Sequence, residues 1–178
     1  MKDASEDKII ESAIKLISER GVYGMSLGEV ALAASVSKGA VQYSFKTKQA
    51  LVEKAAEHCL KSISDALFAW VDSVSASSPA RDAVGALADA MLGDGTFLRV
   101  FIAANGSVEP ESDFEAALDA SMSEWNDLIE LGSMKLKPEL AARMKRLLPA
   151  VIPFLSGLAA MNADPDYAKE AFTAFILG

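Results

Sequence analysis

The stretch MSLGEVALAASVSKGAVQYSFKTKQAL, from Met25 to Leu51, decides how the first part of this chain folds. Ser26 and Glu29 have capping-box spacing ahead of an Ala-rich run, which predicts a short helix that begins directly after Ser26. Ser37 can accept hydrogen bonds from the amides of a second short helix, Lys38 to about Ser44. Two short helices joined by a tight turn make a helix-turn-helix, a unit whose second helix is suited to the DNA major groove.

Helices on both sides of this stretch complete a small bundle. Residues 5–19 place apolar side chains at helical spacing with charged residues opposite, and Gly21 is a good residue to end that helix. Thr47 can cap the helix that follows. Val22 and Tyr23, in the linker after Gly21, are assigned to core packing. The predicted core of the bundle consists of Ile10, Ile14, Ile17, Leu27, Val30, Ala31, Ala34, Val36, Val41, Phe45 and Leu51.

The charge of the chain is unevenly distributed. The 178 residues carry a net charge of -8, and half of them are apolar, so the chain can bury a core. Residues 1–58 have a net charge of zero, whereas residues 59–178 carry the whole excess of negative charge. Within Ser35 to Lys54, four lysines stand against a single glutamate. A local positive patch on an acidic body is the asymmetry expected when one small surface meets phosphate.

The helical pattern continues through the rest of the chain. From Thr47 it runs without a breaker to Val74, about 28 residues, which gives a reach of about 40 Å. This helix connects a first domain, residues 1–46, to a second, residues 47–178. Further helices are expected at Pro79–Leu92, Thr96–Asn105, Ser112 to about Gly132, Pro138–Met161 with a break or kink near Pro149 and Pro153, and Pro165–Leu177. The predicted fold class is all-α, with a small N-terminal bundle and a larger C-terminal helical domain.

The segment from Gly21 to Leu51 resembles the DNA-binding segment of the TetR family of bacterial transcriptional regulators. The most specific residues follow a Ser-capped, Ala-rich helix and a first helix of the right length: Val36-Ser37-x-Gly39, Phe45, Lys48 and Leu51. The resemblance covers roughly residues 5–55. It implies a homodimer, a double-stranded DNA operator with two related half-sites, and a C-terminal domain that binds a small-molecule effector.

Three positions depart from the family pattern. Gln42 stands where the family usually has Tyr, Ser44 where it often has His or a second aromatic residue, and Ser35 replaces a frequent Gly in the turn. The aromatic ring comes one position late, at Tyr43. Because the Gln amide can bond bidentately to adenine in the major groove, these departures change the expected base preference and leave the class of function unchanged.

The residues expected to contact DNA fall into two groups. Phosphate contacts dominate affinity and make it salt-dependent, and Lys48 and Thr47 are the best phosphate ligands because they begin the long helix. On the second short helix, Lys38 and Gln42 can meet base edges, and Gly39 allows close approach of the backbone. The complete expected set is Ser26, Ser37, Lys38, Gly39, Ala40, Gln42, Tyr43, Lys46, Thr47 and Lys48. The alternative for the lysines is a solvated helix face.

Large apolar side chains of the C-terminal part are candidates for an effector cavity. They are Met91, Phe97, Phe101, Phe114, Met122, Trp125, Leu128 and Phe154, together with Met134 and Met161. Each residue alone is better explained by plain core packing. Taken together, they favour a hydrophobic or aromatic effector of modest size, and the acidic composition of this part also permits a cationic one.

The last two helical stretches are the expected dimer interface, because their apolar faces are large for the end of a monomer. The residues assigned to it are Leu147, Val151, Leu155, Leu158, Phe172, Phe175 and Ile176. Two helices from each subunit would form a four-helix bundle, as the resemblance also implies. Two-fold symmetry then places the recognition helices about 34 Å apart, one DNA turn, which matches a palindromic operator.

Several other classes of function are disfavoured. His58 is the sole histidine, so no Ser/His/Asp set is plausible and an enzyme is not expected. Glu57, His58 and Cys59 are adjacent on one helix and do not converge on an ion, so no metal or other cofactor is assigned. A polar start without a signal peptide, the single cysteine and the lack of a long uncharged apolar run predict a cytoplasmic protein without a membrane partner.

The sequence therefore predicts a ligand-responsive transcriptional repressor. An effector that prefers a different angle of the long helix, 47–74, would shift the dimer away from operator spacing. The alternative is a helical module that binds a small molecule or a protein and has reduced or lost DNA recognition. Gln42, Ser44 and the acidic total charge favour this alternative.

Overall fold

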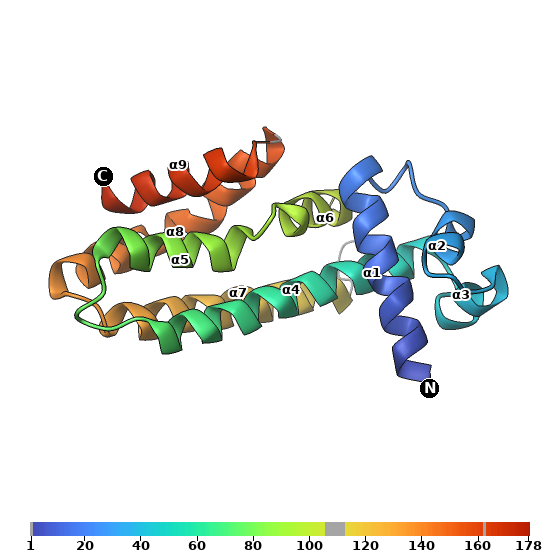
Figure 1. The fold of residues 1–178 in the computed structure, drawn as a ribbon, viewed down its shortest axis with the longest axis horizontal. Coiled ribbons are helices and arrows are strands. Elements are labelled where there is room, and N and C mark those ends of the chain that lie inside the picture. The colour runs from blue at the N-terminus through green and yellow to red at the C-terminus, as the bar shows by residue number, and fades with distance from the viewer. Residues whose placement is uncertain (1, 106–112, 162) are drawn as a thin grey trace.

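The computed structural model describes residues 2–105, 113–161 and 163–178, and regular structure in this part is entirely helical. The helices are α1 (Lys2–Arg20), α2 (Leu27–Ala33), α3 (Lys38–Ser44), α4 (Lys48–Ser73), α5 (Ala80–Leu92), α6 (Thr96–Asn105), α7 (Asp113–Met134), α8 (Pro138–Ala160) and α9 (Pro165–Leu177). In Figure 1, α1 to α3 gather at one end, and α4 leads away from them beside α7. The all-α fold class predicted from the sequence is confirmed.

The predicted N-terminal caps of α2, α3 and α4 are all formed. The Ser26 hydroxyl accepts from the backbone N–H of Glu29 at 3.2 Å, and the Glu29 carboxylate accepts from the Ser26 N–H at 2.9 Å, which completes the capping box. Ser37 accepts from the Ala40 N–H at 3.1 Å. Thr47 caps α4 in the same way. Local hydrogen bonds between side chain and backbone therefore set where α2, α3 and α4 begin.

The core of the N-terminal bundle contains the predicted side chains. All eleven are buried in the hydrophobic core or pack against it, with Val30, Val41 and Leu51 fully buried. The assignment of Tyr23 to this core is wrong, because its side chain is 94% exposed. Gly21, at a φ of 70°, ends α1 and starts a turn that directs Val22 inward, so the next side chain faces solvent.

Helix α4 is the central element of the molecule. Its 26 residues span about 39 Å at 1.5 Å per residue, and it packs against α1, α5, α6 and α7. The approach of α7 is close at Gly132, where an added Cβ would overlap the ring of Trp70. The Trp70 indole N–H donates to the Ala83 carbonyl at 2.9 Å, which ties α4 to α5. A single helix thus carries contacts from the N-terminal bundle to the far end of the body.

Helix α8 runs continuously through both of its internal prolines, so of the expected break or kink the break is wrong and the kink stays a prediction. Proline removes a backbone donor and crowds the preceding turn, which normally interrupts a helix. Pro149 and Pro153 are four residues apart and both are exposed, so they lie on the solvent side of α8. Water can reach the carbonyls that lose their helical partners there.

Most residues assigned to a dimer interface are already buried within one chain. Val151, Leu155, Leu158, Phe172 and Ile176 belong to its hydrophobic core, while Leu147 and Phe175 pack against that core and are half-buried. Helix α9 lies against both α5 and α8, which cover its apolar face. The expectation that these faces are uncovered in the single chain is therefore wrong for the five buried residues.

Among the described residues, no helix is long and apolar enough to cross a bilayer.

Candidate nucleic-acid interface

Helix α3 has one face anchored in the bundle and one face in solvent. Val41 is fully buried and Phe45, its C-cap residue, is 5% exposed, so these two side chains attach the helix to α1 and α2. Lys38, Gln42 and Tyr43 are exposed on α3. A short helix held from behind by apolar contacts, with polar side chains outside, has the form needed to enter a DNA groove.

The turn between α2 and α3 requires an unusual backbone conformation. Ser35 has a φ of 56°, in the left-handed region that favours glycine. The turn is closed by the Val36 N–H, which donates to the Ala31 carbonyl at 2.9 Å. This geometry is a physical reason for a glycine to be frequent at this place in the resembled pattern. Here a serine holds the same turn and bears its steric cost.

The first turns of α2 and α4 lie near each other. The pKa of Glu29 is lowered because the hydroxyl and the backbone N–H of Ser26 donate to its carboxylate, with smaller contributions from the positive charges of Arg20 and Lys48. Arg20 is 3.3 Å from that carboxylate. Because the charge of Lys48 reaches Glu29, two capped helix starts share one region of the surface, and each of them presents backbone N–H groups.

The three capping hydroxyls differ in what they can still donate. The Ser26 hydroxyl donates to the Glu29 carboxylate at 2.8 Å while it accepts from the Glu29 backbone, so its hydrogen is in use. The hydroxyls of Ser37 and Thr47 accept from Ala40 and Ala50 at 3.1 and 3.0 Å. Their hydrogens have no acceptor within the described part of the chain. Ser37 and Thr47 are therefore better placed than Ser26 to donate to an external oxygen.

The residues expected to contact DNA all reach the surface of one bundle. Eight of the ten are exposed, and Ala40 and Lys48 are half-buried. Lys38, Lys46 and Lys48 form no ion pair with any residue that the structure describes, whereas Lys54 is 2.6 Å from Glu57. Three of the four lysines around α3 are thus free of a direct ion pair with the described residues, although the charge of Lys48 also acts on Glu29.

One residue of this surface was left unassigned by the sequence interpretation. Leu32, on α2, is 83% exposed. An apolar residue in an Ala-rich helix carries no distinguishing signal, because its neighbours Ala31 and Ala34 are buried while Ala33 is exposed. Only the orientation of α2 on the bundle shows which side faces outward.

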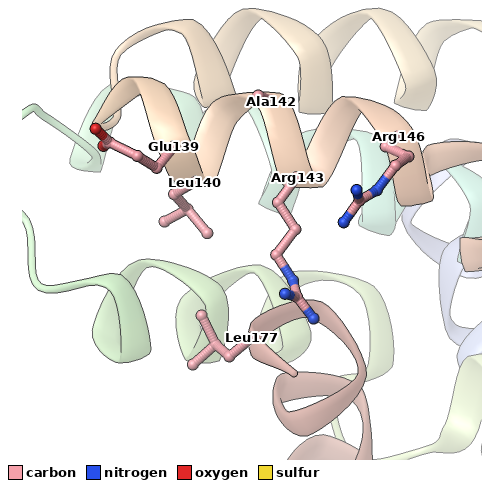
Figure 2. A pocket seen from close by; sticks show the side chains of 6 residues that line it. All are labelled: Glu139, Leu140, Ala142, Arg143, Arg146 and Leu177. Carbon is pink, nitrogen blue, oxygen red and sulfur yellow. The ribbon is translucent and has the colours of Figure 1, made fainter.

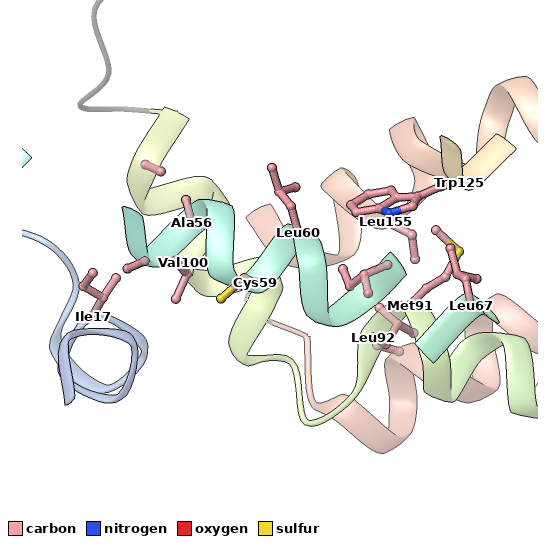
Figure 3. Packing of buried hydrophobic residues seen from close by; sticks show 14 of the residues in the cluster. Ile17, Ala56, Cys59, Leu60, Leu67, Met91, Leu92, Val100, Trp125 and Leu155 are labelled. Carbon is pink, nitrogen blue, oxygen red and sulfur yellow. The ribbon is translucent and has the colours of Figure 1, made fainter. Parts of the chain in front are cut away.

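The residues proposed for an effector cavity do not form one lining. Met91, Phe114, Trp125 and Leu128 are buried in the hydrophobic core, some of which Figure 3 shows. Met134 and Met161 are 73% and 76% exposed, so they are not interior residues. Met122 is half-buried, Phe154 stacks on Phe175 with ring centroids 4.5 Å apart, and the side chain of Phe101 lies outside what the structure describes.

Met91 and Phe97 do line a hollow of about 400 Å³ between α1, α4, α5 and the start of α6. His58 and Cys59 line it too. Burial, with a smaller effect from the negative charge of Asp94, raises the pKa of the Cys59 thiol to about 12, so the thiol is uncharged at neutral pH. The described residues include no group of three or more His, Cys, Asp or Glu side chains that could hold a metal ion.

A second hollow, of about 410 Å³, lies between α8 and the end of α9 (Figure 2). Arg143 and Arg146 line it, with Glu139 at one side. The Arg143 side chain donates through Nε to the Ile176 carbonyl near the end of α9. None of the residues proposed for the effector cavity lines this second hollow.

Comparison with known proteins identifies the class of the N-terminal segment. Residues 9–55 match the family described as bacterial regulatory proteins, tetR family. The N-terminal segment of the chain is thus similar to this family, as the sequence resemblance predicted. Proteins of the family are transcriptional regulators and not enzymes.

Two curated relatives are transcriptional regulators as well. The chain is 35% identical over 78 residues to a probable HTH-type transcriptional regulator, YttP, of Bacillus subtilis, a match over 44% of this chain and 38% of the relative. It is 32% identical over 62 residues to IcaR of Staphylococcus epidermidis, a negative transcriptional regulator of a biofilm operon, over 35% of this chain and 34% of the relative. The chain thus spans little more than a third of the length of these relatives.

Solved structures share the fold over nearly the whole chain. A TetR-family regulator from Mesorhizobium loti has a TM-score of 0.75 at 15% identity, covering 99% of this chain and 95% of that chain. AibR, solved in complex with isovaleryl coenzyme A and operator DNA, has a TM-score of 0.64 at 13% identity, covering 96% and 97% of the two chains. At these identities the likeness concerns the fold alone.

Proposed function

We propose that this protein is a sequence-specific DNA-binding transcriptional repressor that leaves a palindromic operator when a small effector binds. The observation that carries the proposal is the exposed α3, held by Val41 and Phe45 in a bundle that matches the TetR family. Lys38 on α3, and Lys46 and Lys48 after it, form no ion pair with the described residues. The relative IcaR, a negative regulator, supports repression.

Base recognition is assigned to α3. Gln42 is exposed there and can bond to adenine, and Lys38 can donate to guanine. At Gly39 an added Cβ would meet nothing closer than the Ser37 hydroxyl oxygen, at 3.8 Å. No contact with the described residues requires glycine at this position, which supports a close approach of DNA backbone or base edges as the reason for it.

Phosphate binding is assigned to the start of α4. A helix of 26 residues directs its first N–H groups and its dipole toward an anion, and Lys48 adds a full charge in the same turn. Thr47 has a hydroxyl hydrogen to donate. Lys46 and Tyr43 extend the same surface, while Ser37 begins α3 beside it. Domain boundaries at residues 46 and 47 follow, with the reading bundle on one side and the responsive body on the other.

A homodimer is required for a palindromic operator, because one bundle reads one half-site. We assign the pairing to the outward sides of α8 and α9, where Leu147 and Phe175 remain half-buried in the single chain. The similar fold of AibR, which was solved with both an acyl coenzyme A and operator DNA, supports the combination of an operator and a small effector.

The test is a mobility shift with DNA from upstream of the chain's own gene, repeated at several salt concentrations. Selective binding whose affinity falls as salt rises is the expected result. Gln42→Ala should relax discrimination at one base pair by about 1–3 kcal/mol and leave non-specific affinity almost unchanged. The matched control is Gln49→Ala, on α4, where the amide bonds to Glu53 at 3.1 Å.

Loss of selectivity in the control as well would contradict the assignment of base reading to Gln42. If no fragment binds selectively even at low salt, the protein is instead a helical binding module without DNA recognition. Selective binding by a species with the mass of one chain would overturn the homodimer and the palindrome.

A further inference from the structure

We propose that the hollow between α1, α4, α5 and the start of α6 is a binding site for a small organic cation, an amine with an apolar body. The hollow has a volume of about 400 Å³, within the range of small-molecule sites. As the seat of the effector, it rests on the function proposed above. As a ligand site, it is supported by the residues that line the hollow.

The walls of the hollow are apolar and come from four separate helices. Ile14 contributes from α1, Ile63 and Ala66 from α4, Met91 and Leu92 from α5, and Phe97 from α6. Cys59, Met91 and Leu92, labelled in Figure 3, belong to both the packed core and this lining. Such walls take the hydrocarbon part of a ligand and exclude water from it.

The charged side chains that line the hollow are carboxylates, and their partner cations, Lys169 beside Asp89 and Arg99 near Asp94, lie outside the lining. Asp89 and Asp94 line it, and none of the described lining residues is Lys or Arg. The pKa of Asp94 is lowered, chiefly because the Thr96 N–H donates to its Oδ1 at 2.9 Å, so it is ionised at neutral pH. Asp89 is held at 2.8 Å from Lys169. An anionic ligand would meet these carboxylates without a lining cation.

The polar groups of the lining can accept hydrogen bonds from a cation. Each of the two carboxylates has a second oxygen beyond the one bound by Thr96 or Lys169. The Ser62 hydroxyl donates to the His58 carbonyl at 3.1 Å, so its oxygen remains an acceptor. A protonated amine supplies the donors that these oxygens lack.

The two hollows described above are matched in size and differ in the sign of their main charged groups. The hollow lined by Arg143 and Arg146 has about 410 Å³ and presents guanidinium groups, which suit an anion. The hollow at Asp94 is the one that touches α1 and α4 together, so a ligand there bears directly on the N-terminal bundle.

The experiment compares two probes that differ only in their polar end, 4-phenylbutylamine and 4-phenylbutan-1-ol, by isothermal titration of the full chain without DNA. The amine should bind at least about threefold more tightly than the alcohol, because it alone carries a charge for Asp94. Asp94→Asn should remove this preference, since the amide keeps the acceptor for Thr96 and loses the charge. Asp72→Asn, an exposed neutralisation on α4 away from the hollow, should preserve it.

A second variant tests the location. Ala66→Phe fills the hollow from α4 and should weaken both probes by about tenfold or more, with a melting curve recorded to verify folding. The proposal is overturned if neither probe binds, if the alcohol binds as well as the amine, or if Asp94→Asn leaves the preference intact. Because no operator is present, failure of DNA binding in a separate mobility shift would overturn the proposed function and leave this result standing.

Discussion

The N-terminal bundle and the C-terminal body are built by different means. In the bundle, short helices begin at capping hydroxyls that bond to backbone three residues away. In the body, helices are longer and meet through contacts between residues far apart in the chain, such as Trp70 with Ala83 and Lys135 with the Val71 carbonyl. Local chemistry therefore shapes the surface that is proposed to read DNA, while long-range packing shapes the part that is proposed to respond.

The largest effect is expected where the bundle meets DNA. Lys48→Glu should lower affinity for any DNA sequence by about 100-fold or more, because it replaces a phosphate contact by repulsion and opposes the α4 dipole. Fluorescence anisotropy with specific and random duplexes measures this. The control is Lys61→Glu, an exposed lysine farther along the same helix, which should change affinity only slightly. Equal losses in both variants would mean that net charge, and not the start of α4, governs binding.

A pair of glycines tests the packing of the body. Gly132→Ala should destabilise the fold by about 2–3 kcal/mol, because its Cβ would overlap the Trp70 ring and push α7 away from α4. Gly85→Ala, on α5 with open space around it, should instead stabilise by about 0.5–1 kcal/mol. Urea unfolding of both variants gives the comparison. Similar effects of the two substitutions would show that α4 and α7 tolerate a wider separation.

In the turn between α2 and α3, a substitution to glycine should raise the stability of the protein. Ser35→Gly is expected to stabilise the protein by about 0.5–1 kcal/mol, since glycine adopts the φ of 56° without the steric cost that serine bears. Thermal unfolding measures the gain. Ser37→Gly, at a φ of -72°, is the control and should destabilise, because it removes the cap of α3. A loss of stability in Ser35→Gly would mean that the serine side chain contributes more than the turn strain costs.

The smallest effect is expected from acidification of the capping box. Because the pKa of Glu29 is lowered in the folded protein, its charge contributes stability above the ordinary glutamate pKa, and this contribution is lost as pH falls through the lowered value. Glu29→Gln keeps the box and removes the titration. The melting temperatures of the two proteins should therefore converge between neutral pH and about pH 3. If the difference in melting temperature stays constant across this range, the charge of Glu29 does not contribute to the stability of the capping box.

The sequence interpretation succeeded where structure is local. The starts of α2, α3 and α4 were predicted because Ser26, Ser37 and Thr47 act on backbone within one turn. The ranges of α6 and α9 were likewise predicted, since glycine and proline mark their ends. It failed at Tyr23, because the same apolar character suits a core or a turn that faces solvent. It did not decide between a break and a kink in α8, where the helix is continuous, because the effect of an internal proline depends on which side of the helix meets water.

The candidate functional residues show the same difference between local and long-range structure. Lys48 and Gln42 were named from the sequence because their place in a capped helix-turn-helix determines their surroundings. The hollow at Asp94 was not foreseen, because its lining combines residues from four helices and no pattern along the chain relates Ile14 to Phe97. Phe114 and Trp125 were proposed for a ligand and are packed in the core, whereas Met91 and Phe97, proposed with them, line the hollow. Apolar composition specifies burial and does not specify whether the partner is a side chain or a ligand.

The sequence alone determined the structure of the stretch from Met25 to Leu51. Its caps, its turn and its lysines act over a few residues, so the sequence identifies the surface that is proposed to read DNA. What required the tertiary structure is the arrangement of the body around α4. The close approach at Gly132, the covering of α9 by α5, and the carboxylates at the hollow arise from contacts across more than sixty residues in some cases. Residues so far apart in the chain are not linked by local hydrogen bonds, so the packing of whole helices determines which of them meet.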